Sequence, residues 1–400
     1  MWRKAKNCYH YLMALAAAFY YHFPASAIKV IGVTGTDGKT TTVHMIARIL
    51  EESGYKTSYI SSISGAIGAK IIKTESHVTT PSSWQIQRLL RLAVDSRHDF
   101  FVLEATSHGL DQHRLSFIKF QAAVLTNITH EHMDYHKTWE KYALAKLELF
   151  KNSEEKILNV DDDSFKFLSK KIDGHITTYG LGKNADVNTQ DYPLKLQVSG
   201  SYNLHNALAA ASVTQKLGIS KGKIIKALNN FQSPEGRMQS LNFGQDFKVY
   251  IDFAHTPNAL KNALQSLKKE KTKDKKIIAV FGSAGDRDKS KRPLMGKVAE
   301  QNADVIVLTA EDPRSESVDK ICEEIKKGIK IKKLNRGLFI IPQRDKAIDF
   351  AINLAQKGDI VSLLGKGHER VMTYKKEELA WSELETAKKA ILRRLSAKAQ

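Results

Sequence analysis

A glycine-rich run near the start of the 400-residue chain carries its most specific chemical signal. The run IGVTGTDGKTTT, residues 31–42, joins an apolar stretch to a segment with helical periodicity. Such a turn directs backbone N–H groups at phosphate oxygens, and the helix N-terminus adds a favourable dipole. The usual G-x-x-x-x-G-K-[ST] pattern requires glycine where this chain has Val33. We therefore expect a variant phosphate-binding loop, with a glycine turn that binds no nucleotide as the alternative.

Within this loop, Lys39 is expected to contact the β- and γ-phosphates of a nucleotide, and Thr40 to offer a hydroxyl to Mg²⁺. ATP and Mg²⁺ are the cofactors that this chemistry requires. The other loop residues expected around the phosphates are Gly35, Thr36, Asp37, Gly38 and Thr41.

Two further segments contain residues that could bind a metal ion. Glu104 ends the apolar run FFVLEA, at the carboxyl edge of an expected parallel strand, where a carboxylate can hold Mg²⁺. Downstream, His130, His132 and His136 lie close together in the sequence, which could also indicate zinc. No cysteine accompanies these histidines, and the phosphate loop favours Mg²⁺, so zinc is the weaker alternative.

Taken together, these segments resemble the Mur ligase family. The phosphate loop has the form G-x-T-G-T-x-G-K-T-T of Mur ligases and folylpolyglutamate synthases, except that Asp37 stands where Asn is common. EATSHGLDQHR resembles E-x-S-S-H-G-L-x-Q-x-R, and FGSAGDRDKSKRPLMG resembles F-G-x-G-G-D-R-D-x-x-K-R-P-x-M. The resemblance covers nearly the whole chain and implies an ATP-dependent amide-bond ligase that acts through an acyl phosphate.

The resemblance also implies a set of metal and catalytic residues. The stretch TNITHEHMDYHK resembles T-N-x-x-x-D-H-x-D-Y-H, which makes His132 a second Mg²⁺ ligand beside Glu104, with Glu131 in place of Asp. In the family, the lysine that corresponds to Lys146 is carbamylated, and this turns a cation into an anionic ligand near the metal. A solvated helix lysine is the alternative. Lys39, Lys146, Glu104 and His132 are thus the expected catalytic set, and Thr40, Glu104, His132 and carbamylated Lys146 the expected metal site.

Three more residues are expected to contact the nucleotide because of the resemblance. Asn206 in GSYNLHNALAA corresponds to an asparagine that lies against adenine, although helix capping is the plain alternative. Arg237 and Asp252 resemble residues that reach the nucleotide from the second domain, with Asp252 on the ribose hydroxyls.

Two motifs resemble the branch of the family that adds the third residue of the peptidoglycan stem peptide. In GKGHE, Gly365 and Glu369 correspond to residues that contact the incoming amino acid. EDPR resembles D-N-P-R, so Arg314, assisted by Arg287, could pair with the distal carboxylate of meso-diaminopimelate. Asp312 replaces Asn beside that carboxylate. We therefore favour diaminopimelate, with lysine as the alternative.

On the acceptor side, the resemblance implies contacts to a muramoyl-peptide precursor from Thr79, Thr80, Thr106, Gln112 and Arg114. Relatives place a uridine-binding domain before the phosphate loop, whereas here 27 residues precede Ile28. The acceptor could therefore be held by a partner protein, be lipid-linked, or not be a UDP-sugar.

The elements that must position these residues follow an alternating strand and helix pattern. IKVIGV, FFVLEA and AAVLTN read as buried parallel strands, and residues 40–52 as a helix. After a polar linker, a second alternating series contains the strand candidates VYIDFA, IIAVFG, DVIVLTA, LFIIP and IVSLLG. We predict an α/β protein in which a P-loop central domain with a parallel sheet, residues 28–233, precedes a C-terminal Rossmann-like α/β domain, residues 234–400.

The first 27 residues form a separate apolar and basic segment. The apolar stretch within it, residues 9–23, is shorter than the roughly 20 residues that span a bilayer. A signal peptide, a helix in the membrane interface and a helix packed on the protein itself are therefore the competing interpretations of residues 1–24. The net charge of +19 suits phosphates, an anionic precursor or a membrane, while a solvated lysine-rich surface is equally compatible. Nucleic acid is disfavoured as a partner, because no nucleic-acid-binding motif accompanies the charge. ATP use and only two cysteines favour the cytoplasm, where the inner face of the membrane is accessible.

Two rival functions share parts of this pattern. A folylpolyglutamate-type ligase has the same loop but fits GKGHE and SHGLDQHR poorly. A nucleotide-regulated binding protein of the same fold would bind ATP without ligating any amino acid. A P-loop motor or switch is disfavoured, because that class needs no amino-acid contacts from a second domain.

Overall fold

The computed structural model describes residues 2–68, 70–72, 80–129, 131–198, 200 and 202–399. The chain divides into two compact units. Unit 1 contains residues 1–129, 136–198 and 202–232, and unit 2 contains residues 130–135, 199–201 and 233–400. Each unit has its own sheet and its own buried apolar core.

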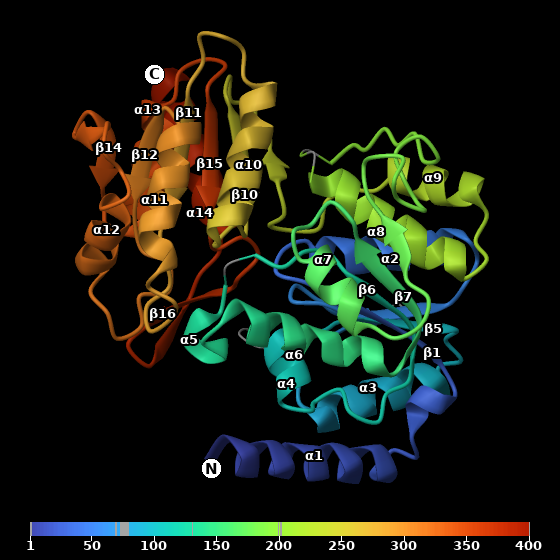
Figure 1. The fold of residues 1–400 in the computed structure, drawn as a ribbon. Helices are drawn as coiled ribbons and strands as arrows, with labels where there is room; N and C mark the ends of the chain where they lie inside the picture. The colour runs from blue at the N-terminus through green and yellow to red at the C-terminus, as the bar shows by residue number, and fades with distance from the viewer. Residues whose placement is uncertain are drawn as a thin grey trace. The chain divides into compact units, whose positions relative to one another are not determined.

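Unit 1 is a sheet with helices on both faces (Figure 1). Within the described residues its eight strands lie in the order β4-β3-β2-β5-β1-β6-β7-β8. The strands from β2 to β8 in this order pair in parallel, whereas β3 and β4 are antiparallel additions at one edge. The strands are β1 (Lys29–Thr34), β2 (Thr57–Ile60), β3 (Gly65–Ile67), β4 (Lys70–Ile72), β5 (Phe100–Glu104), β6 (Phe120–Leu125), β7 (Ser153–Asn159) and β8 (Thr177–Tyr179).

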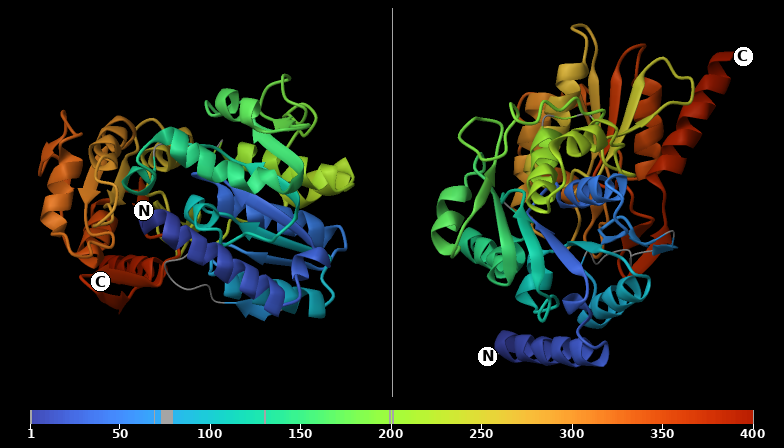
Figure 2. Two further views of the ribbon diagram at one scale, coloured as in Figure 1. Left: turned by 60° about the horizontal axis from the view of Figure 1, so that its bottom comes forward. Right: turned by 90° about the vertical axis from the view of Figure 1, so that its right-hand side faces the viewer.

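The helices of unit 1 cover both faces of this sheet. They are α1 (Trp2–Tyr20), η1 (Pro24–Ser26), α2 (Lys39–Glu52), α3 (Ser83–Asp95), α4 (Ser107–Asp111), α6 (Trp139–Lys151), α7 (Phe165–Leu168), η2 (Ser169–Lys171), α8 (Tyr202–Lys216) and α9 (Lys221–Asn229). The short α5 (Met133–His136) lies at a boundary of the two units along the chain. Helices α2, α8 and α9 pack together over one face, while α6 packs on the other (Figures 1 and 2).

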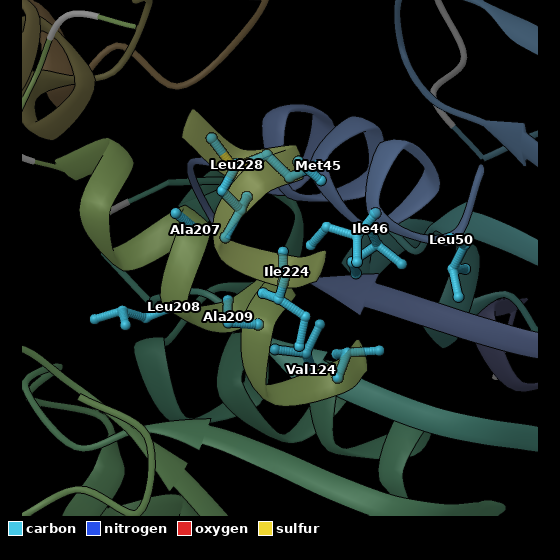
Figure 3. Packing of buried hydrophobic residues seen from close by; sticks show 14 of the residues in the cluster. Met45, Ile46, Leu50, Val124, Ala207, Leu208, Ala209, Ile224 and Leu228 are labelled. Atoms are coloured by element: carbon cyan, nitrogen blue, oxygen red, sulfur yellow. The ribbon is translucent and has the colours of Figure 1, made fainter. Parts of the chain in front are cut away.

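The core under α2 explains why this helix is held firmly behind the phosphate loop. Met45, Ile46 and Leu50 of α2 pack with alanines 207 and 209 of α8 and with Ile224 and Leu228 of α9 (Figure 3). Small alanine side chains let two helices approach closely, and the larger side chains fill the space between them. The apolar spacing in residues 40–52 therefore predicts the buried face of α2 correctly.

Unit 2 is a second open α/β layer structure. In the described part of the chain its main sheet has seven strands in the order β13-β14-β12-β11-β15-β10-β9, parallel except for β9. These strands, and a separate β16–β17 hairpin, are β9 (Gln239–Leu241), β10 (Lys248–Asp252), β11 (Ile277–Phe281), β12 (Val305–Leu308), β13 (Lys333–Leu334), β14 (Gly337–Ile340), β15 (Ile360–Leu364), β16 (Val371–Tyr374) and β17 (Glu377–Ala380).

The helices of unit 2 are α10 (Pro257–Glu270), α11 (Lys291–Asn302), α12 (Val318–Lys326), α13 (Arg344–Leu354) and α14 (Glu383–Ala399). Helices α13 and α14 bury their alanines and isoleucines against β10, β11, β12 and β15. The predicted α/β class, with two mainly parallel sheets, is confirmed. Among the described residues, no helix combines the length and the apolar character that crossing a bilayer requires.

Candidate active site

The phosphate loop occupies the turn between the end of β1 and the start of α2. Gly35 and Gly38 have φ angles of 147° and 85°, which favour glycine. A Cβ atom added at Gly35 would lie 1.8 Å from the Thr126 hydroxyl oxygen, and one at Gly38 would lie 2.2 Å from Asn206 Oδ1. Both the backbone conformation and the close neighbours therefore require glycine at these two positions.

Residues at the end of β6 hold this loop in place. Thr126 Oγ1 donates a hydrogen bond of 2.6 Å to the carbonyl of Asp37. Asn127 accepts from the Asp37 N–H at 3.0 Å and donates to the Asp37 carbonyl at 3.1 Å. The role of these two side chains was not expected from the sequence, although they stand directly after the apolar run of β6, where strand-end residues meet the neighbouring loop.

A buried carboxylate lies beside the loop. The Glu104 carboxylate, at the end of β5, accepts a hydrogen bond of 2.9 Å from the Thr40 hydroxyl and lies 3.7 Å from Lys39 Nζ. Ser62, which follows β2, donates to the same carboxylate from its N–H and its hydroxyl at 3.0 Å. Ser62 was not singled out from the sequence; its signal is its place after the strand that neighbours β5.

This arrangement fits a magnesium–nucleotide complex. Carboxylate and hydroxyl oxygens are the hard ligands that Mg²⁺ prefers, and Glu104 and Thr40 already face each other. Lys39 Nζ donates to the Thr36 carbonyl at 2.9 Å, so its ammonium group lies at the loop. The described residues hold no group of three or more His, Cys, Asp and Glu side chains suited to another metal ion.

Lys146 lies directly under the phosphate loop although it is 111 residues from Gly35 in the sequence. This lysine of α6 is only 1% exposed, and its Nζ donates a hydrogen bond of 2.6 Å to the Gly35 carbonyl. The ammonium group also lies 4.5 Å from the ring centre of Tyr142, whose hydroxyl is 3.0 Å from the Thr36 hydroxyl. The position next to the loop is thus a fact of the fold, while carbamylation stays a prediction.

Four of the five residues predicted to bind the acceptor form one hydrogen-bonded group. The Thr80 and Thr106 hydroxyl oxygens are 2.9 Å apart, and Thr80 Oγ1 donates 3.0 Å to the Glu104 carbonyl. The Arg114 guanidinium donates a hydrogen bond of 2.7 Å to the Thr80 carbonyl and another of 2.7 Å to Gln112 Oε1. The fifth residue, Thr79, lies outside the described residues. The group adjoins Glu104, so the residues predicted to bind the acceptor and those predicted to bind phosphate share one edge of the sheet.

Two other predicted residues have less direct surroundings. Asn206 is buried in α8, donates 3.0 Å to Asn203 Oδ1 and lies against Gly38, as described above. His132 is half-buried, has a φ angle of 57° and belongs to the segment assigned to unit 2. Their roles toward adenine and metal stay predictions.

In unit 2, the two predicted nucleotide residues lie in a tight turn region. The carboxylate of Asp252, at the end of β10, accepts 2.7 Å from the Met238 N–H and 2.8 Å from the Ala254 N–H. The guanidinium of Arg237 lies 4.6 Å from the centre of the Phe253 ring. Asp252 thus shapes the local backbone, and its contact with a ribose stays a prediction.

The GKGHE and EDPR motifs meet in a buried ion cluster. Lys366, with no exposed surface, donates 2.8 Å to Asp312 and lies 2.6 Å from Glu369. The Thr373 N–H donates 2.9 Å to the same oxygen of Asp312. Burial lowers the pKa of Lys366, but Glu369 and Asp312 outweigh it and raise that pKa. Lys366 was not singled out from the sequence; its signal is its place between Gly365 and Gly367.

The remaining predicted residues of unit 2 are Arg314, Arg287 and Gly365. Arg314 has a φ angle of 51° and is held by its N–H, which donates 3.0 Å to the Thr373 carbonyl. Desolvation and then the positive charge of Arg314 lower the pKa of Arg287, whereas the carboxylates of Asp134, Glu131 and Asp286 raise it. Guanidinium groups in one region favour an anion beside them. Gly365 has a φ angle of 105°, and an added Cβ would lie 2.4 Å from Glu311 Oε2.

Comparisons with known proteins match most of the chain to one family. The model of the Mur ligase middle domain matches residues 33–214, and that of the Mur ligase glutamate ligase domain matches residues 236–367. The UDP-N-acetylmuramoyl-L-alanyl-D-glutamate–2,6-diaminopimelate ligase 1 of Clostridium acetobutylicum is 38% identical over 377 residues, covering 89% of this chain and 77% of that relative.

Two further relatives show the same likeness. The UDP-N-acetylmuramyl-tripeptide synthetase of Borreliella burgdorferi is 38% identical over 399 residues, covering 93% of this chain and 78% of that relative. A solved structure of a UDP-N-acetylmuramoyl-L-alanyl-D-glutamate–2,6-diaminopimelate ligase has a TM-score of 0.60 and 29% identity, covering 92% of this chain and 79% of that one.

Proposed function

The chain belongs to the Mur ligase family of ATP-dependent amide-bond ligases, and from this we propose that it adds an amino acid, meso-diaminopimelate in preference to lysine, to a muramoyl-peptide precursor of peptidoglycan. The observation that carries the proposal is the position of Glu104. Its carboxylate accepts from Thr40 of the phosphate loop, and its carbonyl accepts from Thr80 of the acceptor group. One residue thus contacts both the phosphate loop and the proposed acceptor group, which supports the proposal.

The proposed reaction has two steps. The carboxylate oxygen of the acceptor attacks the γ-phosphorus of ATP, and the bond from this phosphorus to the β-phosphate oxygen breaks. ADP is the leaving group, and the acceptor becomes an acyl phosphate. The free amine of the incoming amino acid then attacks the acyl carbon, and phosphate leaves while the amine loses a proton. Lys39 and the loop N–H groups stabilise the charge on the transferring phosphoryl group. Mg²⁺ bound by Thr40 and Glu104 would neutralise further phosphate charge.

We propose that Lys146 acts in this site as a carbamate. Unmodified, its buried ammonium group is stabilised by the Gly35 carbonyl and the Tyr142 ring. Mg²⁺ bound nearby would repel this cation, whereas an anionic carbamate would attract the metal ion. The buried location next to the loop supports the proposal, because a solvated lysine would lie on the outside of α6.

The preference for diaminopimelate is supported by the surroundings of Asp312. An unpaired aspartate would repel the distal carboxylate of diaminopimelate and attract the distal ammonium group of lysine. The Asp312 carboxylate is instead paired with Lys366 Nζ and with the Thr373 N–H. The guanidinium groups of Arg287 and Arg314 would then offer positive charge to the distal carboxylate, which lysine lacks.

The testing experiment measures phosphate release with ATP, Mg²⁺ and UDP-N-acetylmuramoyl-L-alanyl-D-glutamate as acceptor, across a panel that includes meso-diaminopimelate and lysine. We expect turnover that depends on acceptor and amino acid, with diaminopimelate giving the higher kcat/KM. Higher kcat/KM with lysine would overturn the proposed preference. ATP binding without turnover for any amino acid would favour the alternative, a nucleotide-binding protein of this fold without ligase activity.

In the same assay, Lys146→Ala should abolish ligation while ATP binding survives, because the loop and Glu104 remain. Lys141→Ala is the matched control, since Lys141 is an exposed lysine on the same helix. Full activity of the Lys146→Ala enzyme would contradict the carbamate role. Mass analysis under CO₂ should show the carbamate mass on intact wild type only when CO₂ is supplied.

A further inference from the structure

Helix α1 presents two very different faces. Ala14, Ala17 and Ala18, spaced for one side of a helix, are fully buried where α1 packs on α3 (Figures 1 and 2). Nearer its start, Asn7 donates 2.9 Å to the Asp111 carbonyl, and the Tyr11 ring lies 5.1 Å from the Phe117 ring. Helix α1 is therefore fixed along unit 1 through its small side chains.

The opposite face of α1 is apolar and exposed. Positions 12, 15, 16 and 19 have the i, i+3, i+4, i+7 spacing of one helix face, and all four residues are exposed. Phe19 exposes 73% of its surface and Leu12 56%. Tyr9 and Tyr20 are also exposed. Single exposed apolar residues are ordinary, but a contiguous row of them on one helix indicates a binding surface.

The charged residues of the segment 1–27 are all of one sign. Residues 1–27 contain Arg3, Lys4 and Lys6 and no aspartate or glutamate, in a chain with a net charge of +19. Lys6 is exposed. Lysine is depleted at protein–protein interfaces, whereas basic residues beside an apolar helix face attract anionic lipid headgroups. Tyrosines such as Tyr9 and Tyr20 favour the boundary between apolar and polar regions of a bilayer.

We propose that the exposed face of α1 docks this protein on an anionic lipid surface, with the helix lying in the plane of the membrane interface. Leu12, Leu15 and Phe19 would enter the boundary between headgroups and acyl chains, and Lys6 would pair with lipid phosphates. Burying such side chains is favourable, and the lipid charge adds to the attraction.

Docking through α1 has a consequence that rests on the proposed function. Helix α1 contacts the segment 111–117, which includes Gln112 and Arg114 of the acceptor group. A docked enzyme would therefore carry its acceptor residues close to the bilayer, where a muramoyl-peptide with a membrane-embedded end would be concentrated.

The test is flotation of the full chain with vesicles of phosphatidylglycerol and phosphatidylcholine in a 3:7 ratio and with vesicles of pure phosphatidylcholine. We expect flotation with the anionic vesicles that weakens as salt is raised, and much weaker flotation with the neutral ones. Lys6→Gln should weaken binding to anionic vesicles by about fivefold, the effect of one basic residue near the surface. No flotation with either vesicle would overturn the proposal.

The variant Leu12→Ser/Phe19→Ser should lower vesicle binding by about tenfold or more while folding normally, because both side chains are exposed. Ile331→Ser/Leu379→Ser is the control, since these residues expose 80% and 50% of their surface in unit 2. Equal loss in both double variants would overturn the proposal. So would release of self-associated wild type to monomers by the α1 variant without any vesicle binding, which would assign the face to a second copy of the chain. Neither readout needs ligation, so failure here leaves the proposed function standing.

Discussion

At the scale of single residues, Glu311 is the least expected feature of the site region. It follows β12 in the EDPR motif, is buried, and one oxygen, Oε2, has no hydrogen-bond partner among the described residues. Burial raises its pKa from 4.5 to about 7, against the opposing effects of Lys291, Arg344 and Lys366. From the sequence, Glu311 is only the first letter of the EDPR motif, because burial cannot be read from four letters.

This pKa predicts a pH-dependent stability. Between pH 4.5 and about 7, the folded state binds more protons at Glu311 than the unfolded state does, so stability falls as pH rises through this range. Glu311→Gln removes that slope. The free energy of unfolding of the variant, measured with urea, should therefore rise relative to that of wild type by up to about 3 kcal/mol between pH 5 and pH 8. Glu377→Gln, at an exposed glutamate, is the control. A difference in free energy of unfolding between Glu311→Gln and wild type that stays the same at every pH would contradict the prediction.

The charge of Asp312 is matched by a buried lysine, Lys366, in the neighbouring motif. Asp312 alone, replacing an amide, suggests a negative charge at the amino-acid end. The structure pairs it with Lys366, which a second carboxylate, Glu369, also contacts. Asp312 therefore belongs to the internal pairing of the cluster, and its charge is matched by Lys366.

At the scale of elements, the unit of strand β1, loop and helix α2 forms the phosphate site. The strand ends at Thr34, the helix begins at Lys39, and the residues between them make the turn. Strand ends of neighbouring β5 and β6 bring Glu104 and Thr126 to the same edge, because parallel neighbours end on the same side of a sheet. The loop needs these supports as much as its own glycines.

Gly38→Ala should weaken ATP binding by at least about tenfold, because the added Cβ would displace Asn206 and shift the loop N–H groups. The matched control is Gly54→Ala at the other end of α2, where φ is also positive and no atom lies within 4 Å of an added Cβ. Both variants should lose roughly 1–2 kcal/mol of stability from the left-handed backbone. Calorimetric ATP titration distinguishes them, and equal affinities in the two variants would contradict a tight loop.

At the scale of the whole molecule, the chain has two separately cored units. Ligand that binds only the folded state stabilises the unit that binds it, by about 2.7 kcal/mol at a hundredfold excess over Kd. ATP with Mg²⁺ should therefore slow hydrogen exchange at the start of α2 and along β1 and β5 in unit 1. Mass spectrometry of peptides from both units measures this effect. Exchange in unit 1 that is unchanged by saturating ATP would contradict the proposed nucleotide site.

The same experiment addresses the predicted nucleotide residues of unit 2. Slower exchange at the Met238 and Ala254 amides, which donate to Asp252, would support a nucleotide contact there. Unchanged exchange at these amides, with protection in unit 1, would leave Asp252 a structural residue of its turn.

The sequence by itself determined the α/β class and the phosphate loop, because these depend on local patterns. Apolar runs of strand length, helical spacing in residues 40–52 and glycines at 35 and 38 each act within a few residues of their own position. The same holds for the basic, acid-free composition of residues 1–27.

Only the tertiary structure decided which distant side chains meet. Lys146 and Gly35, Thr80 and Glu104, and Lys366 and Asp312 are brought together by sheet order and helix packing, and their spacing along the chain does not contain this information. Burial, which shifts the pKa of Glu311 and leaves Leu12 and Phe19 exposed, likewise depends on every element packed around a residue. Contacts and burial are properties of the assembled chain, since each requires atoms from segments far apart in sequence.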